Sequence, residues 1–304
     1  MSDKYLFHHY DLDGYVGGSI AMASHPDFRP VCCSYDDRMK PLDVVRPGDD
    51  VMVVDYSFLP EEMVWMKENC GSFIWIDHHV SAIRLAEENG YSDVFGMRNV
   101  HHSGAELAWM ALFQGIPLHR FVRMVGEYDT FRNHDGPEFM RDVVPFFYGT
   151  QTLMKERLNP ANMPDNVMSA YSEGQDVLNE SLDVLADACM AAGRTIAKYN
   201  RERYAAENEE AAYVRDMFGL RCLCMNVTGH GGSLQLELPG TYDPAKHDMM
   251  ITYCYNGRTG KWSYGFYSDG HPEVDCSAIA AQFGGGGHRG AAGAVTDRMM
   301  EGLL

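Results

Sequence analysis

The sequence predicts an α/β protein with two domains, an N-terminal domain built on a parallel sheet and a smaller C-terminal α/β domain. Over the first 130 residues, short apolar runs alternate with helix-like stretches. Such alternation is typical of βαβ units and therefore of a parallel sheet. A second set of strand-like runs begins near residue 220, after a long helical stretch. A chain of 304 residues is long enough for two domains that each bury a core.

Composition and charge restrict the classes of function. The 25 Lys and Arg residues against 43 Asp and Glu residues leave a net charge of −18, which argues against binding a long nucleic acid through its backbone. A short anionic substrate remains compatible if bound metal ions supply positive charge. The eight cysteines include no Cys-x-x-Cys pair, so neither a zinc finger nor a disulfide framework is indicated. The chain shows no membrane-length apolar run and no signal-peptide core, so we expect a cytoplasmic protein.

Three apolar runs near the start of the chain have the pattern of buried strands, at residues 5–8, 51–54 and 72–76. The helical stretch after the first run contains Gly17-Gly18, a pair that suits close packing or a close approach of the backbone to a ligand. The second run ends on Asp55, and residues 60–68 after it have the pattern of a helix. In open parallel sheets, ligands bind beyond the carboxyl ends of the strands.

The middle of the chain is predicted to be helical. A helix is expected after Ser103, because Glu106 follows it at the spacing of a capping box. A second helix is expected at residues 118–128, and it leads into Asp129. Residues 138–208 are helical in composition, with a break marked by two prolines, Pro160 and Pro164. We therefore predict three parts, a first domain at 1–190, a helical connection at 191–212 and a second domain at 213–304.

The second domain is expected to contain strands at residues 220–227, 249–255 and 261–267, a hairpin turn at Asn256-Gly257 and a helix at 274–280. Four consecutive glycines at 284–287 follow. A glycine run costs chain entropy on folding, so it predicts a backbone that must approach something closely. We interpret it as a phosphate-binding loop completed by Arg289, with a flexible linker as the alternative.

The segment His9-Tyr10-Asp11-Leu12-Asp13 carries one imidazole and two carboxylates at alternate positions, just past the first strand. Hard or borderline divalent cations prefer such donors. Alone, the pattern is weak, because short His-x-Asp-x-Asp strings occur by chance. It becomes strong together with the acids and histidines that follow the later apolar runs, at Asp55, Asp77-His78-His79 and Asp129.

Together these motifs resemble the DHH phosphoesterase superfamily, in its subgroup with a DHHA1 C-terminal domain. Asp77-His78-His79 matches the name-giving motif, and Gly285-Gly286-Gly287-His288 with Ala291-Ala292-Gly293 is similar to the signature of the accessory domain. Relatives include RecJ-like exonucleases, oligoribonucleases, cyclic-dinucleotide phosphodiesterases and family II inorganic pyrophosphatases. The resemblance implies a DHH metal-binding catalytic domain, a DHHA1 substrate-binding domain and an active site in the cleft between them.

The resemblance further implies two divalent metal ions, usually Mn²⁺, with Mg²⁺ or Co²⁺ as alternatives. It makes His9 and Asp11 ligands of one ion and Asp55 a bridge between the two. The other ion would be held by Asp13, His78 and Asp129. His9 stands two residues before Asp11, whereas many relatives have a spacing of four.

The catalytic residues that the resemblance implies are His79, Asp55 and Asp77, with His79 facing the substrate phosphate and Asp77 orienting a histidine. His8 should point to the opposite side of the strand from His9, and we interpret it as structural. His101-His102 precedes a helix cap and is interpreted as a neighbour of the cap, not as a ligand pair.

The substrate-binding residues that the resemblance implies are Gly285, Gly286, Gly287, His288, Arg289 and Tyr267. Oligoribonuclease-type relatives often carry a Ser-x-Arg-Ser-like strand before the glycine loop, and Tyr267 stands here at the place of its arginine. A tyrosine can stack on a base but cannot bind a phosphate in a bidentate way. Arg258, near the hairpin turn, is an alternative phosphate contact.

The leading hypothesis is a metal-dependent phosphodiesterase, of exonuclease or oligoribonuclease type, that cleaves short oligonucleotides or dinucleotides with a water activated between two metal ions. Four aromatic residues favour a base-bearing substrate, Trp262, Tyr264, Phe266 and Tyr267. The alternatives are a hydrolase of pyrophosphate or polyphosphate and a non-catalytic nucleotide-binding module. The module is disfavoured because four clustered carboxylates would repel one another without metal. We expect no long duplex and no membrane as partners, and a homodimer stays open.

Overall fold

The computed structural model describes residues 2–35, 40–134, 136–153, 175–227, 242–268, 271 and 273–303. The chain forms two compact units, Met1–Ala197 and Lys198–Leu304. The boundary between the units lies inside the long helix α8 (Gln175–Ala211) and within the predicted connection at 191–212. The predicted break at Pro160 and Pro164 lies outside the described residues.

The first unit contains a four-stranded, entirely parallel sheet, as predicted. Its strands are β1 (Lys4–His9), β2 (Arg29–Cys33), β3 (Asp50–Val54) and β4 (Ser72–Ile76), in the order β2-β1-β3-β4. Strand β2 was not predicted from the sequence. It lies at the edge of the sheet and contains Pro30, and a proline within a short run argues against a strand except at an edge.

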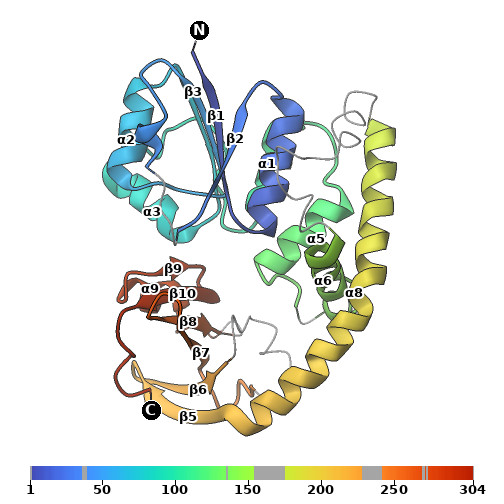
Figure 1. Ribbon diagram of the computed structural model, residues 1–304, viewed down its shortest axis with the longest axis vertical. Helices are drawn as coiled ribbons and strands as arrows, with labels where there is room; N and C mark the ends of the chain where they lie inside the picture. The colour runs from blue at the N-terminus through green and yellow to red at the C-terminus, as the bar shows by residue number, and fades with distance from the viewer. Residues whose placement is uncertain are drawn as a thin grey trace. The chain divides into compact units, whose positions relative to one another are not determined.

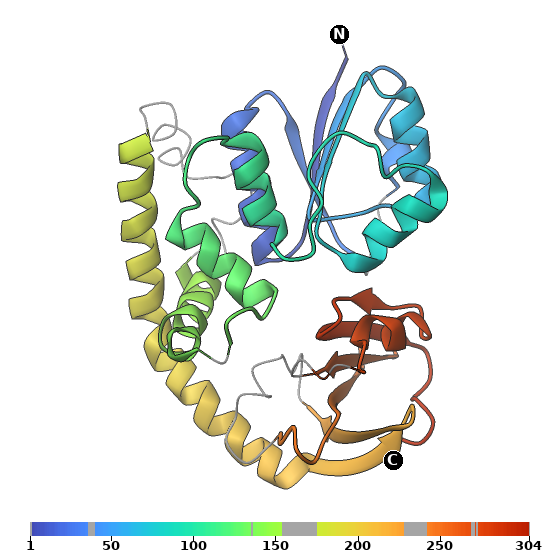
Figure 2. The same ribbon diagram turned by 180° about the vertical axis from the view of Figure 1, so that it is seen from behind.

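Helices cover both faces of this sheet. Figures 1 and 2 show α1 (Leu12–Ser24) on one face and α2 (Pro60–Asn69) with α3 (Val80–Asn89) on the other. On the α1 side, Gly17 allows a close approach, because a Cβ there would lie 2.8 Å from Cγ1 of Val54. The Gly17-Gly18 pair therefore serves close packing of the helix on the sheet, one of the two roles considered for it.

The remaining elements of the first unit include η1 (Pro41–Asp43), α4 (Gly104–Leu112), α5 (Arg120–Asp129), the π-helical turn η2 (Phe139–Val143) and α6 (Val144–Leu153). Helix α4 packs against α1. Its predicted capping box is present, because the Ser103 hydroxyl accepts the Glu106 N–H and Glu106 Oε2 accepts the Ser103 N–H. Helix α5 ends on Asp129, so this acid lies at the end of a helix, whereas Asp55 and Asp77 follow strands.

The second unit contains a six-stranded mixed sheet in the order β5-β6-β7-β8-β10-β9. Strands β6 and β7 are parallel, and the other neighbours are antiparallel. A short helix, α9 (Cys276–Ala281), packs on it. The strands are β5 (Ala212–Met217), β6 (Leu220–Asn226), β7 (Met249–Asn256), β8 (Lys261–Tyr267), β9 (Gly286–Gly287) and β10 (Ala291–Thr296).

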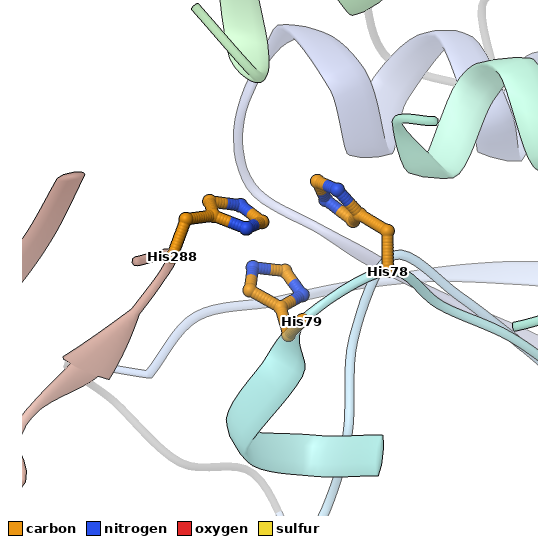
Figure 3. A group of neighbouring side chains, drawn as sticks. All are labelled: His78, His79 and His288. Carbon is orange, nitrogen blue, oxygen red and sulfur yellow. The ribbon is translucent and has the colours of Figure 1, made fainter. Parts of the chain in front are cut away.

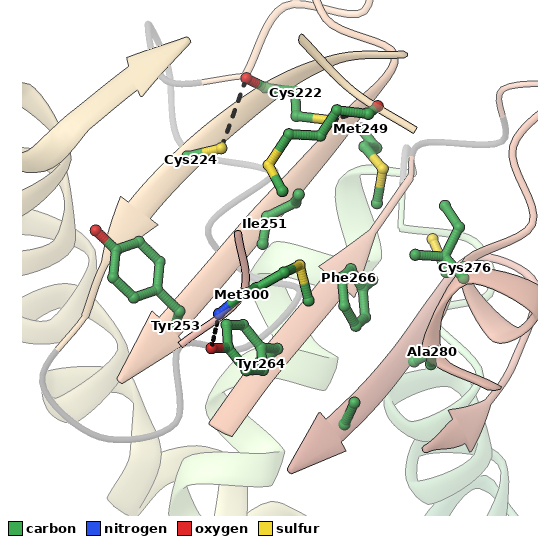
Figure 4. Packing of buried hydrophobic residues seen from close by; sticks show 14 of the residues in the cluster. Cys222, Cys224, Met249, Ile251, Tyr253, Tyr264, Phe266, Cys276, Ala280 and Met300 are labelled. Carbon is green, nitrogen blue, oxygen red and sulfur yellow. Dashed lines mark hydrogen bonds between the residues drawn. The ribbon is translucent and has the colours of Figure 1, made fainter. Parts of the chain in front are cut away.

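The hydrophobic core of the second unit corrects one expectation about aromatic residues. Tyr264 and Phe266 are 4% and 0% exposed within this core (Figure 4), and the Tyr264 hydroxyl accepts the Met300 N–H at 2.8 Å. Neither ring can stack on a nucleobase without unfolding the core. Trp262 packs partly against the same core. Of the four aromatics, Tyr267 alone lies outside this cluster.

The predicted hairpin between β7 and β8 is present, but its connection is longer than a two-residue turn. Asn256 pairs with Lys261, which leaves four residues in the loop. The Asn256 side chain accepts the N–H groups of Arg258 and Thr259 at 3.0 and 3.2 Å, and these bonds hold the longer loop. None of the helices in the described ranges combines the length and the apolar character that crossing a bilayer requires.

Candidate metal centre

The predicted metal ligands of the first unit gather at the carboxyl ends of its strands. His9 ends β1, Asp55 follows β3, and Asp77-His78-His79 follows β4. Asp11 and Asp13 lie at the start of α1, and Asp129 ends α5. This arrangement follows from the parallel sheet, since the ends of all its strands meet at one edge.

One group of possible ligands consists of His9, Asp11 and Asp55. His9 Nδ1 lies 2.7 Å from Asp11 Oδ2 and 3.8 Å from Asp55 Oδ2. Asp11 is the N-cap of α1, and its Oδ1 accepts the Gly14 N–H at 2.8 Å. One carboxylate oxygen of Asp11 is therefore bound to the helix, and this bond directs the other oxygen toward His9.

A second group consists of Asp13, Asp55 and His78, which are all buried. His78 Nε2 lies 3.0 Å from Asp55 Oδ1 and 3.7 Å from Asp13 Oδ2. Asp129 lies beside this group, with its Oδ2 atom 3.5 Å from the same nitrogen. Asp55 belongs to both groups, which is the arrangement that a bridging ligand needs.

Asp55 combines an unusual backbone with a buried carboxylate. Its φ of 55° lies in the left-handed region, which is costly for a residue other than glycine. The side chain is 1% exposed, and neither oxygen accepts a well-formed hydrogen bond from the described part of the chain. The side-chain nitrogens nearest to it are His78 Nε2 at 3.0 Å and His9 Nδ1 at 3.8 Å, and a buried carboxylate needs a cation beside it, either a protonated imidazole or a metal ion. The donor set of two imidazoles and four carboxylates therefore fits divalent metal ions.

The electrostatics of the centre show the same need for cations. Burial and the nearby carboxylates of Asp55 and Asp129 raise the pKa of Asp13 well above its usual value. Burial, together with Asp55 and Asp11, raises the pKa of Asp129 to about 6, although His78 opposes the shift. Burial opposes ionisation of Asp55, but His78 and His9 outweigh it and lower its pKa. These pKa shifts arise because the four carboxylates carry more negative charge than two imidazoles can neutralise.

His79 is held by Asp77 in the way that the predicted orienting role requires. Asp77 Oδ1 lies 2.7 Å from His79 Nδ1 and also accepts the backbone N–H groups of His78 and His79, at 2.7 and 3.2 Å. Figure 3 shows the side chains of His78 and His79 beside each other at the start of α3, and their ring centroids are 4.6 Å apart. Asp77 thus fixes the orientation of His79 through one ring nitrogen.

His8 is 1% exposed, and its Nδ1 lies 2.9 Å from the His9 carbonyl oxygen. Burial lowers its pKa to about 4, so the ring is neutral at physiological pH. It packs against Gly18 of α1, where a Cβ would lie 3.0 Å from Cγ of His8. These contacts agree with the structural interpretation of His8.

Tyr35 is a residue of this region that the sequence did not indicate. Its ring stacks on Tyr56, with centroids 4.5 Å apart, and lies 5.1 Å from the ring of His9 and 6.2 Å from that of His79. Tyr35 follows the unpredicted edge strand β2, and no motif surrounds it. Tyr35 therefore packs against both His9, a possible metal ligand, and His79, a possible catalytic residue.

The last two glycines of the run in the second unit, Gly286 and Gly287, form β9 and pair with β10, so the run is not a flexible linker. A Cβ on Gly285 would overlap the Gly293 carbonyl oxygen, and one on Gly287, where φ is 139°, would lie 2.7 Å from Cα of Ala292. The His288 N–H donates to the Ala291 carbonyl at 2.7 Å and closes the turn. The close approach predicted for Gly285, Gly286 and Gly287 is therefore, in this structure, an approach to β10. Phosphate binding by this loop and by Arg289 stays a prediction.

Tyr267 lies at the end of β8, opposite Ala291 of β10. Its hydroxyl occupies space left by the missing side chain of Gly265, where a Cβ would lie 2.5 Å away. Burial raises the pKa of Tyr267 to about 12, so the hydroxyl keeps its proton. Stacking of this half-buried ring on a base remains a prediction, as does the alternative phosphate contact of Arg258 in the β7–β8 loop.

Comparisons with known proteins give distant likenesses. No protein-family model matches the chain. An uncharacterized protein of Acanthamoeba polyphaga mimivirus is 22% identical over 267 residues, which cover 83% of this chain and 54% of the viral protein. The chain thus spans about half the length of the curated relative that it matches.

Solved structures similar to the chain include a DHH domain from a member of a family of ribosomal proteins, at 15% identity and a TM-score of 0.45, covering 97% of this chain and 82% of that one. RecJ of Thermus thermophilus in complex with Mn²⁺ is 16% identical, with a TM-score of 0.46, covering 97% and 49%. At these TM-scores no site residue is carried over, so the roles below rest on the geometry of this chain.

Proposed function

We propose that this chain is a DHH-type phosphohydrolase that cleaves phosphodiester bonds of short oligonucleotides or dinucleotides with the help of two divalent metal ions. The observation that carries the proposal is the shared carboxylate of Asp55. It belongs to both ligand groups described above, is buried, and faces the imidazole nitrogens His78 Nε2 and His9 Nδ1 at 3.0 and 3.8 Å. Two imidazoles and three further carboxylates around one shared carboxylate form the donor set of a two-metal centre, and without a metal the carboxylates would repel one another.

The ligands assigned to the two ions are those of the two groups, with Asp129 added to the second because its Oδ2 lies 3.5 Å from His78 Nε2. His9, Asp11 and Asp55 would hold one ion, and Asp13, Asp55, His78 and Asp129 the other. The four aspartates bring four negative charges, which two divalent cations neutralise, so a phosphate can still enter. Bound ions of this kind would supply Lewis acidity, which lowers the pKa of a bound water to near neutrality and polarises a phosphoryl oxygen.

The remaining polar side chains have roles that need no nucleophilic serine or cysteine. His79, fixed by Asp77, would donate a hydrogen bond or a proton toward a phosphate oxygen. Asp77 would keep the ring in the tautomer or charge state that allows this donation. Tyr35 would limit the movement of the His9 and His79 rings by its contacts with both.

The proposed substrate class follows from the net charge and the aromatic residues of the chain. The net charge of −18 disfavours long nucleic acids, so a short substrate is proposed. Burial of Tyr264 and Phe266 removes half of the aromatic residues that favoured a base-bearing substrate. This burial makes pyrophosphate and polyphosphate the second candidates, because the same metal centre serves phosphoanhydride cleavage.

The test is a substrate panel assayed with defined metal. Short RNA and DNA oligomers, linear dinucleotides, pyrophosphate and polyphosphate are each incubated with the protein after chelation, and then with Mn²⁺ or Ca²⁺ added back. We expect no hydrolysis in EDTA and recovery with Mn²⁺ but not with Ca²⁺, since calcium prefers all-oxygen ligands. Hydrolysis of oligonucleotides that persists in chelator would refute the metal mechanism. Turnover of pyrophosphate or polyphosphate alone would select the second candidate.

A further inference from the structure

The first turn of α4 holds the carboxylate of Asp13, although Asp13 belongs to α1. The Gly104 N–H donates to Asp13 Oδ2 at 2.6 Å, and the Ala105 N–H donates to Asp13 Oδ1 at 3.1 Å. These N–H groups have no partner inside a helix, and the positive end of the helix favours a carboxylate there. Both oxygens of Asp13 are thereby fixed in direction.

The same turn lies against Asp55. A Cβ added to Gly104 would overlap Cβ of Asp55, so the helix backbone is in direct contact with the base of this side chain. Asp55 is already constrained by its left-handed backbone and by the bond from its N–H to the Ile76 carbonyl at 2.8 Å. The α4 turn closes the space into which the side chain could otherwise rotate.

A third contact of this turn leads to the segment that carries Asp129. Glu106, 1% exposed, pairs through Oε1 with an Arg132 guanidinium nitrogen at 2.6 Å. The second terminal nitrogen of Arg132 donates to the His101 carbonyl. Glu106 also lies against Gly126 of α5, where a Cβ would be 2.5 Å from its carboxylate carbon.

Arg132 follows Asp129 by three residues, across a strained turn. Phe131 and Asn133 both have positive φ values, 51° and 59°, and the Arg132 N–H donates to the Glu127 carbonyl at 3.1 Å. A backbone of this kind persists only where the surrounding contacts hold it. Glu106 supplies such a contact from outside the turn.

We infer that the first turn of α4 is the positioning element of the metal centre, and that the Glu106–Arg132 pair is the part of it that places Asp129. The inference rests on the proposed two-metal function. Neither Glu106 nor Arg132 is among the possible metal ligands, so both act through other residues. Loss of the pair should weaken the metal site that uses Asp129 and spare the site formed by His9, Asp11 and Asp55.

The test is a calorimetric Mn²⁺ titration of the metal-free full chain and of three variants, Arg132→Met, Glu106→Gln and the double variant. Loss of residues that orient ligands typically weakens metal binding about 10- to 100-fold. We expect this loss at one of two sites in Arg132→Met and in Glu106→Gln. The double variant should lose no more than the single variants, because each single substitution already removes the ion pair. Arg132→Lys, which keeps one charged contact, should recover part of the affinity.

The matched control is Arg123→Met, which removes the neighbouring pair of Arg123 with Glu127 on α5 (3.1 Å). It should leave both sites unchanged. A wild-type chain that binds fewer than two Mn²⁺ ions refutes the proposed function itself. Two sites with unchanged affinities in Arg132→Met and Glu106→Gln refute the positioning role alone. If circular dichroism shows that Arg132→Met is unfolded, Arg132→Lys and Glu106→Gln decide by the same criterion.

Discussion

His78 Nε2 lies 3.0 Å from Asp55 Oδ1, and both side chains are 1% exposed. A buried imidazole beside a buried carboxylate favours the protonated ring, and here the carboxylates of Asp55 and Asp129 raise the pKa of His78 well above its usual value against the effect of burial. His9 behaves in the same way, since Asp11 and Asp55 outweigh burial and raise its pKa to about 11. In the metal-free chain, protons therefore occupy the positions that metal ions would take.

The first prediction is that Mn²⁺ binding releases protons. His9 and His78 carry protons at pH 7 in the metal-free chain, and a metal-bound imidazole is neutral, so about two protons should leave when both sites fill. Apparent affinity should rise with pH, by about tenfold per pH unit for each proton released. Below about pH 6 it should fall further, because Asp129 is then protonated as well. Titration calorimetry in buffers of different ionisation enthalpy counts the protons. A count of zero at pH 7 would contradict the ligand assignment.

The second prediction compares Asp55→Asn with His101→Ala. An amide at position 55 cannot bridge two cations with two anionic oxygens, so hydrolysis should fall by at least about 10³-fold and Mn²⁺ binding should weaken at both sites. His101 is exposed and is absent from the possible ligand groups, and its contact with Arg132 uses the backbone carbonyl. His101→Ala should keep activity within about twofold. Comparable losses in the two variants would show that the centre is misplaced.

The third prediction concerns Gly104→Ala. The added methyl overlaps Asp55, so the variant should lose about 1–3 kcal/mol of unfolding free energy and bind Mn²⁺ more weakly. Gly257→Ala is the control, because a Cβ there meets nothing within 4 Å, and its stability should change by less than about 0.5 kcal/mol. Urea unfolding of both variants, with and without Mn²⁺, provides the measurement. Equal stability and metal affinity in Gly104→Ala and the wild type would show that the contact with Asp55 is not tight.

The gathering of acids and histidines was predictable because it depends on chain direction. Once residues 5–8, 51–54 and 72–76 are interpreted as parallel strands, whatever follows each of them must lie at one edge of the sheet. The lone pattern around Asp11 thereby becomes part of a cluster. The contacts of Arg132 with α4 depend on the packing of two helices, and no short-range pattern in one sequence reports such packing.

For the aromatic strand β8, the sequence does contain a pattern that predicts which rings are buried. Trp262, Tyr264 and Phe266 alternate, and alternate residues of a strand share one face. That face is the core of the second unit, whereas Tyr267 lies on the other. All four rings lie in one strand, so their number alone does not distinguish its two faces. The glycine run was ambiguous for a different reason, because a close approach to a ligand and a close approach to another strand require the same residue.

The last prediction distinguishes the two arginines proposed to contact substrate phosphate, Arg289 and Arg258. A charge-assisted hydrogen bond is worth about 1.5–3 kcal/mol, so removing the correct arginine should lower kcat/KM for a dinucleotide roughly 10- to 150-fold. We expect this loss in Arg289→Ala and a change within about twofold in Arg258→Ala. The main-chain bond in which the Cys276 N–H donates to the Arg289 carbonyl survives the substitution, so folding should be preserved.

Mn²⁺ affinity should be unchanged in both variants, because all assigned ligands belong to the first unit. Bis-p-nitrophenyl phosphate, which makes fewer remote contacts, should be affected less than the dinucleotide. The reverse ranking of the two variants would assign phosphate binding to Arg258, and equal losses on both substrates would remove Arg289 from substrate recognition.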